Sequence, residues 1–170
     1  MVGYMGCGKT SMSKRLAKRL GMRFVDTDTM VEQIEGATIA DIFRYEGEEY
    51  FRKIERQMLE RSVASGDDVV VSTGGGLPAW GDNMEYMNRS GKTIYLRRSA
   101  EQIASRLSPY GRQKRPKLRG LNDEELIRFM RENMAEREPF YAKSHLVVDG
   151  GGLSDNEILN TITDWIGNGR

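Results

Sequence analysis

Short runs of apolar residues alternate with amphipathic stretches along the whole chain. Four of these runs are rich in Val, Ile, Phe and Tyr, which favours β-strands: Met22–Asp26, Asp68–Ser72, Lys92–Leu96 and His145–Asp149. Strands that are buried on both faces show continuous apolar runs instead of strict alternation with polar residues. The pattern therefore predicts a parallel sheet.

Helical patterns fill the segments between the predicted strands. In Thr10–Leu20 the apolar residues recur every four positions, and Gly21 supplies a left-handed stop. Alternating strands and helices predict one α/β domain over residues 1–170, with right-handed crossovers. The other helical candidates are Thr38–Asp41, which resembles a capping box, and the amphipathic segments Glu48–Ala64, Asn122–Glu136 and Ser154–Ile166.

The most specific motif lies in the first ten residues. Gly3–Thr10 matches G-x-x-x-x-G-K-[ST] at every fixed position. Glycines let a chain curl until its backbone N–H groups, and those of the following helix, point at one anion. Lys9 is expected to bridge terminal phosphates, and the Thr10 hydroxyl to hold Mg²⁺. The residues predicted to bind the nucleotide are Gly6, Cys7, Gly8, Lys9, Thr10 and Ser11.

The strand that should precede such a phosphate loop is nearly absent. Only Met1 and Val2 come before Gly3 in this sequence. Either the start of the chain has been lost or the central strand is very short, and the residues do not decide between the two. A missing strand leaves unpaired edges on its neighbours, so we expect reduced stability if no other element fills that place.

Further polar motifs follow predicted strands or flank predicted helices. Asp26-Thr27-Asp28 closes the first predicted strand and Thr73–Gly76 follows the second, while Phe51–Glu55 opens a helix and Arg137–Tyr141 ends one. Ligands of open parallel sheets bind at the carboxyl ends of the strands. Each motif also has a structural explanation on its own: an Asp cap, an Arg–Glu pair on a helix, a flexible turn, or a cation at a helix C-terminus.

Together with the phosphate loop, these motifs resemble the shikimate kinases, small P-loop enzymes of the nucleoside-monophosphate-kinase type. The D-x-D, F-R-x-x-E, G-G-G and R-x-P-x-Y elements occur in that order between Gly3 and about Asp149. The resemblance implies a three-layer fold, with helices flanking a parallel sheet of about five strands whose first strand is truncated here, and a mobile lid. It also implies transfer of the γ-phosphate of ATP to the 3-hydroxyl of shikimate, on the route to chorismate and the aromatic amino acids.

The resemblance also assigns roles to residues. Asp28 would hydrogen-bond the acceptor hydroxyl, and Asp26 would act on Mg²⁺ through water beside Thr10. Lys9, Asp28 and Arg115 form the implied catalytic set, and the acceptor-binding helical segment would span about residues 27–62. The implied shikimate-binding residues are Asp28, Arg52, Gly74, Gly75, Gly76 and Arg137. Guanidinium forks suit a carboxylate, and glycines let a ring approach the backbone.

A basic segment over about residues 106–120 is the predicted lid, from which Arg115 would contact ATP. Residues 106–119 hold six cations and no acid. A solvated loop and a nucleic-acid patch are the alternatives, but aromatic residues other than Tyr110 are missing from the segment. After Arg115-Pro116 the family usually has Leu-Leu, whereas this chain has Lys117-Leu118.

Composition narrows the possible functions further. The chain carries 26 lysines and arginines and 25 acids, a net charge of +1, which gives no general support for nucleic-acid binding. One cysteine and one histidine exclude an internal disulfide and argue against multi-histidine metal chemistry. The sequence shows no bilayer-length apolar run and no signal peptide. We expect a cytoplasmic monomer without nucleic-acid or membrane partners.

Two other functions remain open at this point. One is a different small P-loop kinase, for gluconate or a nucleoside monophosphate, although the D-x-D motif and the glycine triplet argue against a nucleotide acceptor. The other is a non-catalytic nucleotide-binding module that signals through its lid. It predicts ATP binding without turnover of any hydroxylated acid.

Overall fold

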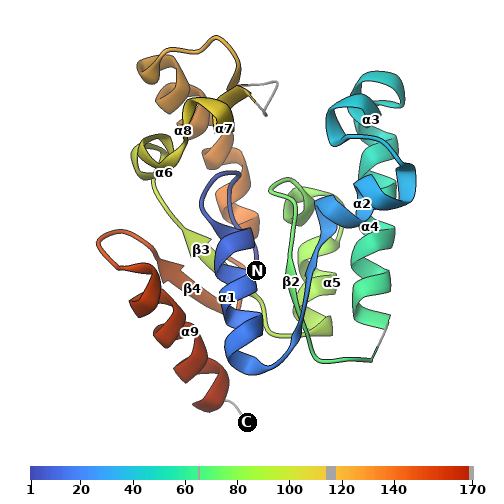
Figure 1. Ribbon diagram of the computed structural model, residues 1–170, viewed down its shortest axis with the longest axis vertical. Coiled ribbons are helices and arrows are strands. Elements are labelled where there is room, and N and C mark those ends of the chain that lie inside the picture. The colour runs from blue at the N-terminus through green and yellow to red at the C-terminus, as the bar shows by residue number, and fades with distance from the viewer. Residues whose placement is uncertain (65, 114–117, 169–170) are drawn as a thin grey trace.

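Parallel strands form the centre of the molecule. The computed structural model describes residues 1–64, 66–113 and 118–168. Within these ranges, strand β1 pairs in parallel with β2, and β3 pairs in parallel with β4 (Figure 1). Their bounds are Arg23–Asp26, Val69–Ser72, Ile94–Arg97 and Leu146–Asp149, respectively.

Met1 and Val2 join the two strand pairs into one sheet. The Met1 nitrogen donates to the Val71 carbonyl oxygen at 2.5 Å, and the Thr73 nitrogen donates to the Met1 carbonyl oxygen at 3.2 Å. On the other side, Val2 exchanges two backbone hydrogen bonds with β3, at 2.8 and 3.0 Å. The strand order is thus β1, β2, residues 1–2, β3, β4, which confirms the prediction of about five parallel strands.

Helices cover both faces of this sheet and complete three layers. Helices α1 and α9 lie on one face, and α4, α5 and α8 on the other (Figure 1). No helix of the described residues is both long and apolar enough to cross a bilayer. The helices are α1 (Lys9–Leu20), α2 (Thr27–Glu35), α3 (Ile39–Tyr45), α4 (Gly47–Ala64), α5 (Asn83–Ser90), α6 (Ala100–Arg106), α7 (Pro109–Gln113), α8 (Asp123–Tyr141) and α9 (Asp155–Asn168), with a 3₁₀ turn, η1 (Leu77–Ala79).

The apolar residues form two separate clusters. The larger one lies between the sheet and its covering helices and includes Val2 and Leu96, which are both 1% exposed. The smaller one joins α2, α3 and α4 through Val31, Ile42, Phe51 and Met58. The segment predicted to hold the acceptor therefore has a core of its own beside the β1–β2 edge of the sheet (Figure 1).

Candidate functional site

The phosphate-loop motif forms a tight turn between the two-residue strand and α1. Gly3, Gly6 and Gly8 have φ angles of +145°, +82° and +98°, which residues with a side chain rarely adopt. Gly8 immediately precedes α1, and no side chain caps that helix. The first N–H groups of α1 therefore lack a side-chain partner and can bind an anion.

Lys9 folds back over this turn. Its side chain is 7% exposed, and its ammonium donates to the Tyr4 carbonyl oxygen at 3.1 Å. Cys7 is fully buried, and its backbone N–H donates to the same oxygen at 3.2 Å. Ser11 lies in the first turn of α1 and is exposed. The structure thus gathers the predicted nucleotide residues at one loop, where Cys7 shapes the turn from inside.

Thr10 and Asp26 lie together at the carboxyl end of β1. The Thr10 hydroxyl donates to Asp26 Oδ2 at 3.0 Å and lies 3.4 Å from the Ser72 hydroxyl. The other oxygen of Asp26 accepts from the backbone of Asp28 and Thr29, so Asp26 also caps α2. The capping explanation and the predicted position beside Thr10 both hold, because one carboxylate oxygen caps α2 and the other accepts from Thr10.

The donor set around Thr10 fits Mg²⁺. Hydroxyl and carboxylate oxygens are the ligands that this ion prefers, and it usually keeps several waters and binds substrate phosphates as well. The described residues contain no group of three or more His, Cys, Asp or Glu side chains that could hold a metal alone. Thr10 and Asp26 therefore suit an ion that is shared with a nucleotide.

The glycine triplet packs directly against acidic side chains. A Cβ atom on Gly74 would collide with the Glu55 carboxylate and would lie 2.5 Å from Asp28 Oδ1. The Gly74 nitrogen donates to the buried Thr27 hydroxyl at 2.9 Å, which fixes the turn after β2. Only glycine fits at this position, so the motif is more than a flexible turn.

Arg52 lies beneath the last glycine of the triplet. Its guanidinium donates to Glu55 at 2.6 Å and to Glu48 at 3.1 Å. A Cβ atom on Gly76 would lie 2.7 Å from Arg52 Cζ. The i,i+3 pair predicted on α4 is therefore present, and it holds the guanidinium against the triplet.

Burial perturbs both carboxylates of this region. It raises the pKa of Asp28 to about 6, with a further increase from Asp26 and an opposing effect of Lys9 and Arg52. Burial also raises the pKa of Glu55 to about 7, although Arg52 opposes the shift. Glu55 Oε1 is buried without a hydrogen-bond partner among the described residues. Two carboxyl groups thus share a poorly hydrated space with cations, as is common at functional sites.

Arg137 reaches the same space from α8. Its guanidinium carbon lies 5.5 Å from the centre of the Tyr4 ring, and its charge lowers the pKa of Glu55. Tyr141, one turn further along α8, donates from its hydroxyl to the Gly75 carbonyl oxygen at 2.5 Å. The structure therefore brings Asp28, Arg52, Arg137 and the glycine triplet together.

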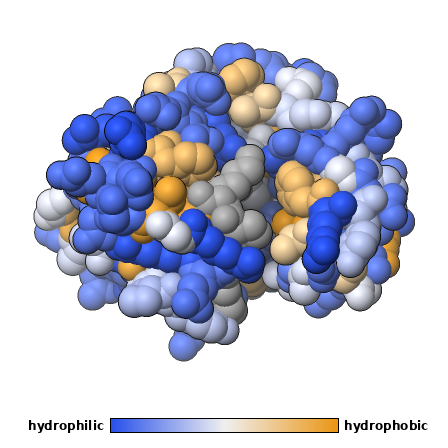
Figure 2. All heavy atoms as spheres, turned by 90° about the horizontal axis from the view of Figure 1, so that it is seen from above, coloured by the Kyte–Doolittle hydropathy of each residue, from blue (hydrophilic) through white to orange (hydrophobic). Residues whose placement is uncertain are grey.

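This acceptor region borders the phosphate loop. A Cβ atom on Gly75 would lie 3.2 Å from the backbone nitrogen of Met5, which belongs to that loop. Lys9 is also close enough to affect the pKa of Asp28. Figure 2 shows the molecule from above, with a mostly hydrophilic rim and hydrophobic atoms nearer the middle of the face. The predicted nucleotide and acceptor residues are thus neighbours.

The predicted lid is described only in part. Arg115 falls within residues 114–117, which lie outside the described residues. Of the neighbouring cations, Arg112 pairs with Asp123 at 2.6 Å, which ties α7 to the start of α8. The nucleotide contact of Arg115 stays a prediction.

Sequence reasoning missed several side chains of the site. Ser72 lies beside Thr10, and Thr27 accepts from the glycine triplet. Tyr141 stands in the quoted R-x-P-x-Y motif but received no role. The Tyr4 hydroxyl is buried without a partner among the described residues. The motif tyrosine and the middle residue of D-x-D could have been singled out, whereas the contacts of Ser72 and Tyr4 depend on the fold.

Known proteins resemble this chain along nearly its whole length. A family model described as "Shikimate kinase" matches residues 5–167. The shikimate kinase of Parabacteroides distasonis is 47% identical over 164 residues, which cover 96% of this chain and 94% of that protein. This degree of identity over the full fold extends the similarity well beyond the phosphate loop.

Solved structures agree with the sequence comparison. The crystal structure of shikimate kinase from Bacteroides thetaiotaomicron superimposes with a TM-score of 0.88 at 36% identity, covering 97% of this chain and 95% of that one. The enzyme from Acinetobacter baumannii, solved in complex with shikimate, gives 0.87 at 31% identity, with coverages of 99% and 92%. The chain therefore belongs to the shikimate kinase family, whose members transfer a phosphate group from ATP to shikimate with Mg²⁺.

Proposed function

We propose that this chain phosphorylates the 3-hydroxyl of shikimate between two groups of residues, one for the nucleotide and one for the acceptor. The observation that carries the proposal is a shared space. Asp28, Arg52 and Arg137 converge on the glycine triplet, and the triplet lies against the phosphate loop that carries Lys9. A carboxylate-bearing alcohol in that space would present its hydroxyl to a bound phosphate.

The nucleotide side supplies alignment and positive charge. The free N–H groups around Gly8 would bind phosphate oxygens, and Lys9 would leave the Tyr4 carbonyl to bridge the terminal phosphates. Thr10 would hold Mg²⁺ directly, and Asp26 would hold it through water. The ion would neutralise phosphate charge as the phosphoryl group moves. Positioning and charge neutralisation account for most of the catalysis in phosphoryl transfer.

The acceptor side supplies orientation and a proton acceptor. Arg52 and Arg137 would bind the shikimate carboxylate, as paired guanidinium groups do. Asp28 would orient the 3-hydroxyl and take its proton late in the transfer. Its pKa of about 6 leaves it mostly ionised at neutral pH yet basic enough to accept a proton.

The lid and the domain limits belong to the same proposal. Residues 106–120 would close over ATP, bring Arg115 to the phosphates and exclude water, which limits wasteful hydrolysis. Residues 27–62 would form the acceptor-binding part of a single kinase domain that spans residues 1–170. We also infer that the enzyme acts as a cytoplasmic monomer. Light scattering on the purified enzyme tests the monomer.

The carboxylate-binding role can be tested with a modified acceptor. The methyl ester of shikimate keeps the hydroxyls but lacks the negative charge. We expect Arg137→Ala to raise the KM for shikimate at least tenfold, because charge-assisted hydrogen bonds contribute about 1.5–3 kcal/mol, and to leave the KM for ATP unchanged. With the ester, the variant and the wild type should differ by less than about threefold.

A matched control keeps this test specific. Arg128 lies on an exposed position of the same helix, so Arg128→Ala should leave both KM values unchanged. If Arg137→Ala raises the KM for the ester as much as the KM for shikimate, the guanidinium does not bind the carboxylate. If it raises the KM for ATP equally, Arg137 does not belong to the acceptor side.

A further inference from the structure

Tyr4, inside the phosphate loop, contacts a cation from each side of the proposed site. Its backbone carbonyl accepts from the Lys9 ammonium at 3.1 Å. Its ring faces the Arg137 guanidinium, whose carbon lies 5.5 Å from the ring centre. Lys9 belongs to the proposed nucleotide side and Arg137 to the proposed acceptor side. One residue of the loop therefore contacts the first side through its backbone and the second through its side chain.

The two arginines of the acceptor side have different partners. Arg52 forms ion pairs with Glu48 and Glu55. Within the part of the chain that the structure describes, Arg137 pairs with no carboxylate and lies over the face of the Tyr4 ring. A ring face attracts a guanidinium without occupying its five N–H donors. Arg137 therefore keeps its charge and its donors for a bound carboxylate, whereas Arg52 already shares its own.

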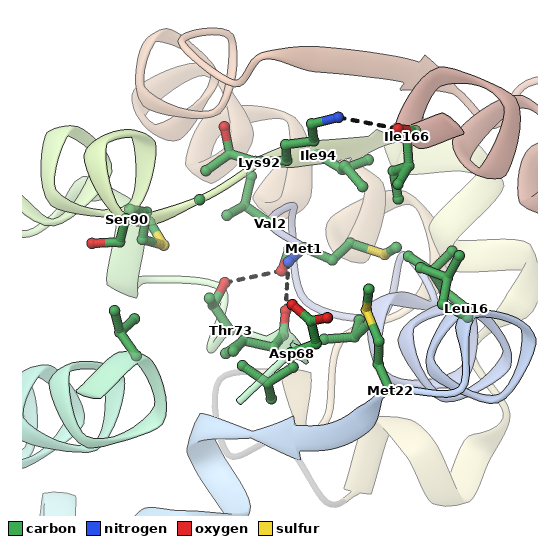
Figure 3. Close-up of a pocket in the computed structure, with 18 of the residues that line it drawn as sticks. Met1, Val2, Leu16, Met22, Asp68, Thr73, Ser90, Lys92, Ile94 and Ile166 are labelled. Carbon is green, nitrogen blue, oxygen red and sulfur yellow. Dashed lines mark hydrogen bonds between the residues drawn. The ribbon is translucent and has the colours of Figure 1, made fainter. Parts of the chain in front are cut away.

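The Tyr4 ring has a fixed position beside the glycine triplet. It is 1% exposed and packs into the larger apolar cluster. The Met1 carbonyl accepts from the Thr73 backbone N–H at 3.2 Å and from the Thr73 hydroxyl at 3.3 Å (Figure 3). Thr73 directly precedes the triplet, and Val2 bonds to β3 on the other side. The segment that leads to Tyr4 is thus held on both sides.

We propose that Tyr4 is a positioning residue whose ring face holds the Arg137 guanidinium ready for the acceptor carboxylate. The proposal rests on the proposed function, in which Arg137 binds that carboxylate. The Tyr4 hydroxyl takes no part, because it has no hydrogen-bond partner among the described residues. The Lys9 contact uses a backbone carbonyl, which every substitution at position 4 retains. The ring should therefore affect the binding of the acceptor and not that of ATP.

Substitutions at position 4 separate the ring face from the rest of the side chain. Tyr4→Leu removes the ring and should raise the KM for shikimate about three- to tenfold, with kcat and the KM for ATP unchanged. Tyr4→Phe keeps the ring, so its KM for shikimate should stay within about twofold of the wild type. Pentafluorophenylalanine at position 4 keeps the shape of that ring but reverses the charge on its face. It should act like Tyr4→Leu, even where the Leu variant folds poorly.

Two further measurements show whether the ring acts through Arg137. In an Arg137→Ala background, Tyr4→Leu should change the KM for shikimate by less than about twofold, because the contact is already lost. With the methyl ester of shikimate, Tyr4→Leu and the wild type should differ equally little. Ile162→Val, at a fully buried position of α9, is the control for reduced stability and should leave every KM unchanged.

Different results contradict the role of Tyr4 and the proposed function. If Arg137→Ala raises the KM for shikimate but neither ring-altering variant does, Arg137 binds the carboxylate without the ring. If the effect of Tyr4→Leu persists in the Arg137→Ala background, or extends equally to the KM for ATP, Tyr4 acts through the packing of the phosphate loop. Both results overturn the role of Tyr4 and leave the proposed function standing. A normal KM for shikimate in Arg137→Ala would overturn the role of Arg137 as well.

Discussion

Glycine and acidic residues at the proposed acceptor site depend on each other. The Gly74 backbone lies so close to Glu55 and Asp28 that a side chain there would displace both carboxyl groups. The same closeness keeps water away and raises the pKa of each carboxyl group. Close packing of the backbone at this site therefore also prepares Asp28 for its proposed role as a proton acceptor.

Glu55 should make the stability of the enzyme depend on pH. Its pKa in the folded protein, about 7, lies above its ordinary value of 4.5. The folded protein thus binds an extra proton between these values. The stabilisation of the folded protein by this extra proton on Glu55 is complete below pH 4.5 and is lost as the pH rises through 7. Glu55→Gln removes this titration, so the unfolding free energy of the wild type should fall relative to that of the variant, by roughly 1–3 kcal/mol between pH 5 and pH 8.

Urea unfolding at several pH values measures this difference. Glu136→Gln, at an exposed position on α8, is the control and should track the wild type at every pH. A constant difference between the wild type and Glu55→Gln across the range would mean that Glu55 titrates alike in both states. Burial in the folded protein would then not change the pKa of Glu55.

The two sets of hydrogen bonds of Asp26 show what the sequence could reveal at single residues. The strand-closing Asp suggested a helix cap, and the family resemblance implied a position beside Thr10; one carboxylate makes the cap and the contact with Thr10. Ser72 carried no such signal, because its contact with Thr10 joins residues 62 positions apart. Site residues within short sequence motifs could therefore be predicted, whereas contacts that the sheet makes between distant residues could not.

At the scale of elements, α8 connects the proposed acceptor site to the core. Tyr141 is completely buried, packs against Tyr95 with the ring centres 5.1 Å apart and donates to the Gly75 carbonyl. Tyr141→Phe would leave that half-buried carbonyl without its partner, at a cost of about 1–2 kcal/mol in unfolding free energy. The glycine triplet would also lose a support, so the KM for shikimate should rise severalfold while the KM for ATP stays unchanged.

Denaturant unfolding and initial-rate kinetics measure the two effects together. Tyr45→Phe is a suitable control because Tyr45 is 72% exposed and its ring contact with Arg44 does not need the hydroxyl. A Tyr141→Phe enzyme with normal stability and a normal KM for shikimate would show that the hydroxyl does not support the triplet.

Strands and helices with a clear apolar pattern were predicted better than helices without one. The four predicted strands and α1, α4 and α9 lie within two residues of their observed bounds. Helix α8 runs on to Tyr141, five residues beyond the predicted end at Glu136, even though Pro139 in its last turn has no N–H to donate. Helices α5 and α6 have eight and seven residues, too few for a clear period, although Ser99 and Gln102 form a capping box on α6.

The whole molecule places the proposed kinase site at one end of its sheet. Thr10 and Asp26 lie together at the carboxyl end of β1, where ligands of open parallel sheets bind. Met1 and Val2 join β2 to β3 and lead directly into the phosphate loop. The sheet therefore positions the segment that holds the proposed nucleotide site.

The most direct test of the central claim is an ADP-release assay with a panel of acceptors, on the wild type and on Lys9→Ala. Shikimate should support turnover, whereas gluconate, AMP and water alone should give rates at least 100-fold lower. Lys9→Ala should lose at least about 100-fold in kcat with shikimate, because it removes charge from the transition state, and Lys18→Ala on the exposed face of α1 should not. Equal ADP release without shikimate, or near-normal turnover by Lys9→Ala, would contradict the account.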